Sequence, residues 1–154
     1  VVFSHYQTSG RGTGDRRWVC PRGGGAMFSL VVKPERELPA SALVALALEC
    51  AEQIAGWLRR KRGISADIKE PNDVLVQGRK ISGVLLEQVA DKLVIGVGLN
   101  TNLVPQELGE EIAATSVLEE TGEKCDNFAV AQELAQLIYT SLNEGHRSPG
   151  ENDR

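Results

Sequence analysis

A single long helix pattern, set between shorter strand patterns, most constrains the fold of this chain. Over residues 39–62, apolar side chains recur at helical spacing on one face: Leu43, Leu46, Ala47, Cys50, Ile54, Trp57 and Leu58. Pro39 suits the start of this helix and Gly63 suits its end. A helix with one apolar stripe must bury that stripe against another layer of structure.

Strand patterns stand on both sides of this helix. They cover residues 1–6, 26–33, 66–69, 74–77, 80–89 and 93–99. The later strands are separated by tight turns at 71–73, 78–79 and 90–92, which predicts an antiparallel meander. Two more helices are predicted, at 113–121 and from Asp126 or Asn127 to about residue 144. The order of elements predicts an α+β fold, in which helices cover one face of a mostly antiparallel sheet.

Length and charge indicate one globular domain. The 154 residues suit a domain over 1–144, followed by a polar tail at 145–154 that we expect to be disordered. The net charge of −4 argues against nucleic acid as the main partner, because domains that bind it usually have a basic excess. We interpret the basic run Arg59–Arg62 as the last turn of the long helix, where the helix dipole favours cations. A nucleic-acid patch is the alternative.

The cysteines and the hydropathy of the sequence indicate where in the cell the protein is expected. Its three cysteines are odd in number and far apart, which predicts neither a disulfide framework nor a zinc site and favours the reducing cytoplasm. No unbroken apolar run approaches 18 residues, so we expect no membrane span. The first residues read as the middle of a strand, and we expect the natural protein to continue upstream.

The first candidate site is the glycine- and arginine-rich loop that runs from Gln7 to Trp18. Glycines allow backbone N–H groups to converge on an anion, and arginines add donors that match phosphate oxygens. The loop is not a P-loop, because no Gly-Lys-Ser/Thr follows, and it opens no helix as a dinucleotide-binding motif would. It could cover a nucleotide phosphate, or it could be an ordinary surface loop.

Two further segments could hold ligands. In Lys69-Glu70-Pro71-Asn72-Asp73, the last two side chains offer oxygens that suit Mg²⁺, and Lys80 follows at the start of the next strand. An ordinary turn is the alternative reading. In the strand 93–99, Gly96 and Gly98 share one face, which would let a flat ligand lie on the backbone. A β-bulge is the alternative there.

The ordered set of motifs resembles the biotin protein ligases of the biotin/lipoate ligase superfamily. The matching residues are Gln7, Gly10-Arg11-Gly12, Lys69-Glu70-Pro71-Asn72-Asp73, Lys80-Ile81-Ser82-Gly83 and Gly96-Val97-Gly98-Leu99-Asn100. The resemblance covers about residues 1–142 and implies a class II synthetase-like catalytic core. It also implies a two-step reaction, in which biotin and MgATP form biotinyl-AMP and a lysine of a biotin carboxyl carrier protein domain then takes the biotinyl group.

The resemblance implies a role for each matched residue. Lys80 would bridge the biotin carboxylate and the α-phosphate, and Arg11 would lie over the intermediate. The residues implied to bind biotin or its adenylate are Gln7, Gly10, Gly83, Gly96, Gly98 and Trp18. Those implied to bind the nucleotide are Arg16, Lys69, Asn72, Asp73 and Asn100, with Asn72 and Asp73 also holding Mg²⁺.

The chain departs from the family pattern at several points. Thr13 stands where the family often has a second loop arginine, and Glu70 stands where it has tryptophan. An early strand that contacts biotin and a small C-terminal β domain would lie outside this sequence. No helix-turn-helix precedes the core, so we expect no DNA partner, and a homodimer paired through an open sheet edge is one arrangement that the resemblance allows. A lipoate or octanoate ligase, or a catalytically degenerate ligand-binding homologue, remains the alternative function.

Overall fold

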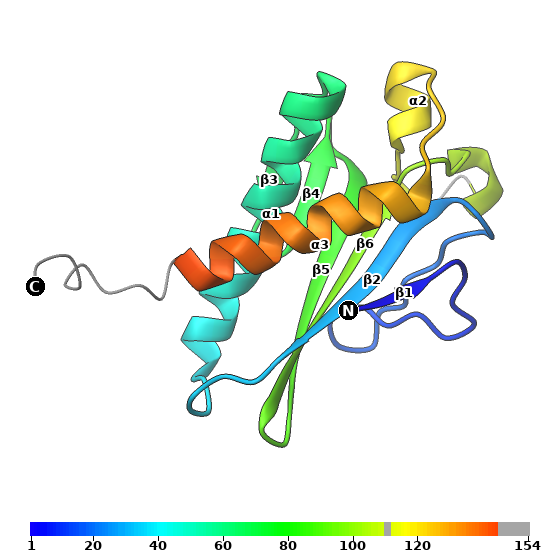
Figure 1. Cartoon of the computed structure of the whole chain (residues 1–154). Coiled ribbons are helices and arrows are strands. Elements are labelled where there is room, and N and C mark those ends of the chain that lie inside the picture. The colour runs from blue at the N-terminus through cyan, green and yellow to red at the C-terminus, as the bar shows by residue number, and fades with distance from the viewer. Residues whose placement is uncertain (110–111, 145–154) are drawn as a thin grey trace, which may run out of the picture.

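Six antiparallel strands form one sheet in the order β1-β2-β6-β5-β4-β3 (Figure 1). Their bounds are β1 Val2–Ser4, β2 Gly25–Val32, β3 Asp67–Lys69, β4 Asp73–Val76, β5 Arg79–Val89 and β6 Lys92–Asn100. The computed structural model describes residues 1–109 and 112–144. The antiparallel arrangement predicted from the tight turns is therefore confirmed, although β2 pairs with β6, which lies far from it in the sequence.

Two long helices cover the same face of the sheet (Figure 1). They are α1 (Ala40–Arg62) and α3 (Asn127–Glu144), which agree closely with the predicted helices. Gly63 ends α1 with a left-handed φ of 67°, a conformation that glycine adopts without steric cost. Asp126 begins α3, because its carboxylate accepts hydrogen bonds from the amides of Phe128 and Ala129.

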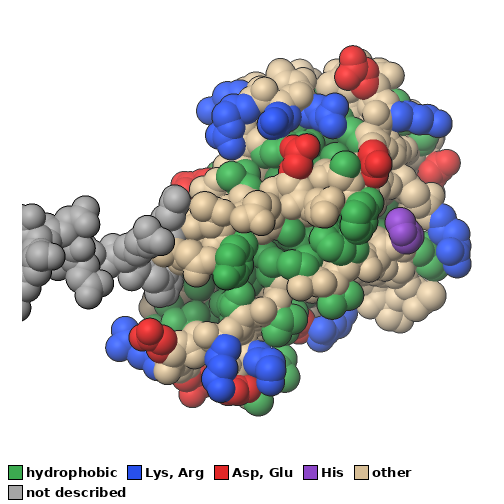
Figure 2. Space-filling view, viewed as in Figure 1, with side chains coloured by type: hydrophobic (Ala, Val, Ile, Leu, Met, Phe, Trp, Pro, Cys, Tyr) green, Lys and Arg blue, Asp and Glu red, His purple; other side chains and the backbone are tan. Residues whose placement is uncertain are grey.

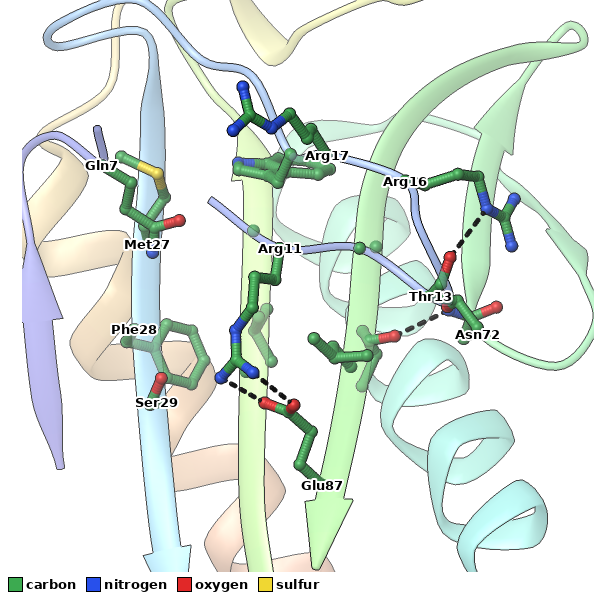
Figure 3. A pocket seen from close by; sticks show the side chains of 18 of the residues that line it. Gln7, Arg11, Thr13, Arg16, Arg17, Met27, Phe28, Ser29, Asn72 and Glu87 are labelled. Atoms are coloured by element: carbon green, nitrogen blue, oxygen red, sulfur yellow. Dashed lines mark hydrogen bonds and ion pairs between the residues drawn. The ribbon is translucent and has the colours of Figure 1, made fainter. Parts of the chain in front are cut away.

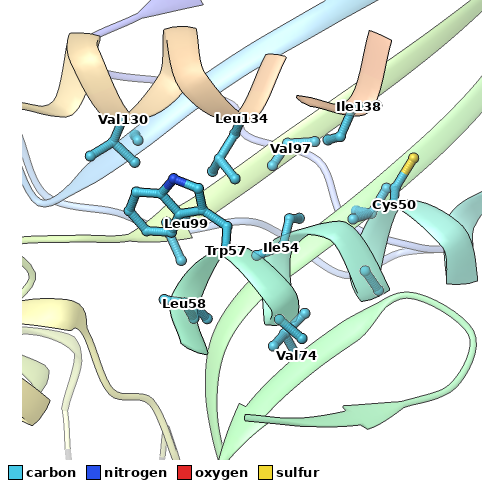
Figure 4. Packing of buried hydrophobic residues seen from close by; sticks show 14 of the residues in the cluster. Cys50, Ile54, Trp57, Leu58, Val74, Val97, Leu99, Val130, Leu134 and Ile138 are labelled. Atoms are coloured by element: carbon cyan, nitrogen blue, oxygen red, sulfur yellow. The ribbon is translucent and has the colours of Figure 1, made fainter. Parts of the chain in front are cut away.

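The core lies between these helices and the sheet (Figure 4). Ile54 and Leu58 of α1 and Leu134 of α3 are almost fully buried there. The indole of Trp57 packs in the same cluster, and its N–H donates to Glu133 on α3 over 2.9 Å. This bond links the two helices and satisfies a polar group that burial would otherwise leave unpaired.

Helix α1 has the length predicted for it, but it is more apolar than the sequence analysis allowed. By length and composition alone it could cross a membrane, with a mean hydropathy of 1.3 over an 18-residue window. The expectation that no such segment exists was therefore too strong. The face of α1 that includes Cys50, Ile54 and Leu58 is nevertheless buried against the sheet and α3, which is the packing of a core helix.

The basic run predicted at the end of α1 is found in its last turn. Figure 2 shows arginine and lysine side chains at this end of the helix-covered face, with acidic side chains among them. The guanidinium of Arg62 lies 5.4 Å from the ring centre of Trp57, so part of the run packs on the protein itself. These contacts favour the interpretation as a helix terminus.

Two local predictions differ from the structure. The turn between β4 and β5 is formed by Gln77 and Gly78, both with positive φ, so β5 begins one residue earlier than expected. Helix α2 covers only Val117–Thr121 instead of 113–121. Residues 113–115 instead form backbone hydrogen bonds with Lys80, from its amide to the carbonyl of 113 and from the amide of 115 to its carbonyl, both over 2.9 Å. The predicted tail at 145–154 lies outside the described residues.

Within residues 1–109 and 112–144, no helix covers the second face of the sheet, and the residues on that face differ from those of the core. On β2 and β6 the core face alternates with residues such as Met27, Ser29, Gly96 and Gly98. Ser29, Gly96 and Gly98 are small and leave space above the backbone on this face. The loop between β1 and β2 crosses that space and encloses a cavity.

Candidate active site

The cavity on the free face of the sheet has a volume of about 480 Å³, within the usual range for small-molecule sites. Its floor is a ladder of paired residues across β2, β6 and β5. The rungs of this ladder are Met27–Gly98–Gly83, Ser29–Gly96–Leu85 and Val31–Val94–Glu87. Gly83 of the motif at 80–83 and Gly96 and Gly98 of the motif at 96–100 therefore meet on one patch of backbone.

The two glycines of β6, Gly96 and Gly98, have different surroundings. A Cβ on Gly98 would lie 2.5 Å from Cε2 and Cζ2 of Trp18, so the indole rests directly on this glycine. A Cβ on Gly96 would meet nothing closer than the carbonyl oxygen of Leu85, at 3.6 Å, and would stand open in the cavity. The predicted close approach at Gly98 is thus made by the protein's own tryptophan, while Gly96 leaves room for a ligand.

A β-bulge aims Lys80 into this cavity. Val74 pairs with Ser82 and Leu75 pairs with Lys80, so β5 has one extra residue, Ile81, at this point. Regular alternation would place Lys80 and Gly83 on opposite faces, and the extra residue returns Lys80 to the face of Gly83. As a result, the ammonium of Lys80 lies 3.2 Å from where a Cβ of Gly83 would be.

The ammonium of Lys80 is paired with a buried carboxylate. Its Nζ lies 2.7 Å from Oδ1 of Asp73, whose side chain is only 12% exposed. Nζ also stands 5.8 Å from the ring centre of Trp18. This pairing fixes the ammonium over the glycine floor, where it could meet an anionic ligand.

The backbone of Lys80 also has a side-chain partner, Asn100. Asn100 is buried, and its amide donates to the carbonyls of Lys80 and Thr115. Asn100 does not line the cavity, although the sequence analysis placed it beside the nucleotide. In this structure it acts through Lys80, by fixing the strand from which the lysine projects.

The loop between β1 and β2 forms a narrow hairpin of its own over the cavity. The amide of Gly12 donates to the carbonyl of Arg16 over 2.8 Å, and the amide of Trp18 donates to Gly10 over 3.0 Å. A Cβ on Gly10 would lie 2.4 Å from the carbonyl oxygen of Trp18. Only glycine lets the two arms approach this closely, so Gly10 shapes the loop and does not line the cavity.

Arg11 leaves this loop and reaches across the floor to β5 (Figure 3). Its guanidinium forms two bonds with the carboxylate of Glu87, from Nη1 to Oε1 over 2.8 Å and from Nη2 to Oε2 over 2.7 Å. This is the parallel, bidentate geometry that arginine and carboxylate favour. The pair lies at the end of the ladder opposite Gly83 and Lys80.

The tip of the loop is joined to the turn before β4. The Asn72 side chain donates to Oγ1 of Thr13 over 3.1 Å and to the carbonyl of Val84 over 2.8 Å (Figure 3). The side chain of Arg16 in turn donates from Nε to the carbonyl of Thr13. Thr13 therefore makes a short neutral contact where the family pattern often has a long cation.

The cavity is electropositive although the whole chain is acidic. The charged residues that line it are Arg11, Arg16, Arg17, Lys80, Asp73 and Glu87, so four cations and two carboxylates give a formal charge of +2. The chain as a whole has a net charge of −4. Such local focusing of positive charge attracts anionic ligands.

Cysteine chemistry does not contribute to this site. None of the described cysteines lines the cavity. Burial and, to a smaller extent, the charge of Glu107 together raise the pKa of the Cys20 thiol to about 11. Because the thiolate is the nucleophilic form, Cys20 is inert at neutral pH.

Most residues predicted from the motifs line the cavity. They are Gln7, Arg11, Arg16, Trp18, Asn72, Asp73, Lys80, Gly83, Gly96 and Gly98. Lys69 and the divergent Glu70 are exposed and lie outside it. Sequence reasoning missed Glu87, Met27 and Ser29. Glu87 shares the face of Gly83 by simple alternation along β5, a pattern that was readable in the sequence.

The sequence is similar to a known protein family and to several of its characterised members. The sequence model of the Biotin/lipoate A/B protein ligase family matches residues 1–101. The chain is 34% identical over 141 residues to the Bifunctional ligase/repressor BirA of Bacillus subtilis, covering 87% of this chain and 43% of that protein. It is 28% identical over 134 residues to the biotin–[acetyl-CoA-carboxylase] ligase of Mycobacterium tuberculosis, covering 77% of this chain and 45% of that ligase.

A solved structure gives the same picture at the level of the fold. The biotin protein ligase from Aquifex aeolicus, solved in complex with biotin and ATP, superimposes with a TM-score of 0.80 at 33% identity. The match covers 92% of this chain and 60% of the other. The chain spans about half the length of the curated relatives it matches.

Proposed function

This chain belongs to the biotin/lipoate A/B protein ligase family, and from that premise we propose that it activates biotin with ATP and transfers the biotinyl group to a lysine of a carrier domain. The observation that carries the proposal is the placement of Lys80. Its ammonium lies on the glycine floor of an electropositive cavity, beneath a glycine–arginine loop. A biotin ligase solved with biotin and ATP shares this fold at 33% identity.

In the first proposed step, a carboxylate oxygen of biotin attacks the α-phosphorus of MgATP. A new phosphorus–oxygen bond forms as the bond to the β-phosphate oxygen breaks, and pyrophosphate leaves. The two reactants are both anions, so the barrier is largely electrostatic. Lys80 would lie between the carboxylate and the α-phosphate, and Arg11 and Arg16 would neutralise charge from the loop.

In the second proposed step, the amine of a carrier lysine attacks the acyl carbon of biotinyl-AMP. The acyl–oxygen bond breaks, AMP leaves, and the amine nitrogen gives up a proton to water as the amide forms. Lys80 would again offset the negative charge of the departing phosphate. The anhydride is already activated, so no strong base has to be supplied.

The remaining cavity residues would position the two ligands. Gln7, Gly83 and Gly96 would contact biotin, with Gly10 and Gly98 acting through the loop and through Trp18. The indole of Trp18 rests on Gly98, so it would have to shift to complete the adenylate pocket. Lys69 could reach a phosphate only from outside the cavity.

Asn72, in the turn before β4, and Asp73, the first residue of β4, would hold an Mg²⁺ ion that arrives with ATP. Asp73 pairs with Lys80 through one carboxylate oxygen, and Asn72 donates through its side-chain nitrogen. The second carboxylate oxygen and the amide oxygen would be the ligands. Mg²⁺ is usually held by one or two protein oxygens together with phosphates and waters. No group of three or more His, Cys, Asp or Glu side chains suited to a metal occurs within residues 1–109 and 112–144.

The proposal is tested by acyl transfer to a purified biotin carrier domain. The protein would be incubated with ATP, Mg²⁺ and either biotin, lipoate or octanoate, and the intact mass of the carrier would be measured. We expect a mass increase of one biotinyl group with biotin alone. Labelling by lipoate or octanoate in preference to biotin would favour the other branch of the family, and no labelling with any acid would favour a degenerate homologue.

A further inference from the structure

We propose that Glu87 is a positioning residue, which holds Arg11 away from Lys80 until an anionic ligand displaces it. This inference rests on the proposed function, because it concerns the loop arginine of that reaction. It starts from the two bonds between Arg11 and Glu87, of 2.8 and 2.7 Å, that cross the floor of the cavity (Figure 3). Glu87 belongs to none of the motifs that identify the family.

Geometry separates the resting guanidinium from the reaction centre. Lys80 lies over Gly83, and Glu87 follows Gly83 by four residues along β5. At the usual rise of a strand this is about 14 Å. While Arg11 is bonded to Glu87, its charge therefore lies at the far end of the ladder, and it cannot also contact a phosphate held by Lys80.

The exposure of the pair makes it exchangeable. The Arg11 side chain is 71% exposed and the Glu87 side chain 30% exposed. An ion pair of this kind contributes at most about a factor of five to an equilibrium, because water screens it. An acyl phosphate that also touches Lys80 and the loop amides would outcompete one carboxylate, so the pair would hold the loop without trapping it.

Two of the cations of the proposed mechanism, Lys80 and Arg11, thus pair with two different acids. Lys80 is paired with Asp73, which is mostly buried and remains beside it, whereas Arg11 is paired with Glu87 at the open end. This arrangement compensates both charges within the protein. Only Arg11, which projects from a loop, has the freedom to leave its partner.

The first test measures hydrogen exchange in the ligand-free protein. Glu87→Gln keeps the size of the side chain but removes its charge, and we expect it to lower the protection of the Gly12 and Trp18 amides by two- to five-fold. Glu87→Asp should restore part of the protection. In an Arg11→Ala background, Glu87→Gln should have no further effect, because its partner is gone.

The second test measures the kinetics of biotin-dependent pyrophosphate exchange. Because Glu87 competes with the ligand for Arg11, Glu87→Gln should lower the KM by about two- to five-fold with little change in kcat. Asp91→Asn is the matched control. It removes a carboxylate paired with Lys33 over 2.9 Å at the turn of the same hairpin, outside the cavity, and should change neither readout.

The outcomes distinguish this inference from the proposed function. Unchanged amide protection in Glu87→Gln would overturn the holding role, and a raised KM would show that Glu87 instead contacts a substrate. If the wild-type protein itself gives no exchange, the proposed function fails. The protection data on the ligand-free protein would still decide whether Glu87 holds the loop.

Discussion

The two glycines of β6 provide a sharp prediction, because an added methyl group meets different surroundings at each. Alanine at position 96 would place its Cβ 3.6 Å from the nearest atom, which is an ordinary contact. Alanine at position 98 would place it 2.5 Å from the indole of Trp18, closer than any real contact. Neither glycine has a positive φ, so backbone strain contributes to neither substitution.

The expected effect of Gly98→Ala is on stability. Forcing the indole off the floor is an overpacking change, which costs about 1–3 kcal/mol. For a chain of this size that lowers the Tm by roughly 2–12 °C. Gly96→Ala should leave the Tm unchanged or raise it by a few degrees, since alanine reduces the conformational freedom of the unfolded chain by about 0.4–1 kcal/mol.

Gly96→Ala should weaken the binding of biotin, although it should not destabilise the fold. Its methyl group would stand in the cavity where a ligand should lie on the backbone, and a misfit of about 1–3 kcal/mol corresponds to a rise in KM for biotin of roughly 5- to 150-fold. Thermal unfolding followed by circular dichroism and biotin-dependent exchange measure the two effects. If Gly96→Ala unfolds like Gly98→Ala, or keeps the wild-type KM, the assignment of Gly96 to the ligand floor is wrong.

Three further predictions concern single groups. Lys80→Ala should reduce the rate of adenylation roughly 100- to 1,000-fold, because loss of one preorganised charge usually has an effect of this size. Activity near that of the wild type in the pyrophosphate exchange assay would show that Lys80 has no part in the mechanism. Asp126→Ala should lower the free energy of unfolding by about 1 kcal/mol in urea, because it removes the acceptor of two amides at the start of α3; no change would deny that cap. Burial raises the pKa of the Cys50 thiol to about 12, so iodoacetamide at pH 8 should label this cysteine only after the protein unfolds. The extent of labelling should increase as the pH rises, because the thiolate is the reactive form. Rapid labelling of the native protein at pH 8 would contradict the burial of Cys50.

Local patterns were sufficient to predict most of the fold. The stripe from Leu43 to Leu58 defined α1, and tight turns defined the hairpin of β5 and β6. The pairing of β2 with β6 was not readable, because it joins segments on either side of α1. The start of α2 was missed because residues 113–115 prefer backbone bonds to Lys80, a tertiary contact that no local pattern reveals.

The site was predicted through its motifs, but its internal contacts were not. The resemblance to a family located Lys80, Gly83 and the glycine–arginine loop, which the cavity brings together. It could not show that a bulge aims Lys80, that Trp18 lies on Gly98, or that Asn100 works through the backbone. These details depend on register and packing, which short motifs do not determine. Location in the cytoplasm, a homodimer and the absence of a DNA partner stay predictions.

Biotin-dependent exchange of label between pyrophosphate and ATP tests the central claim most directly, because it requires only the first chemical step and no carrier. The folded protein should exchange label when biotin is present, should not do so without biotin, and should lose the activity in Lys80→Ala. If the folded protein gives no exchange with biotin, or gives it only with lipoate or octanoate, the proposal that this cavity forms biotinyl-AMP is contradicted.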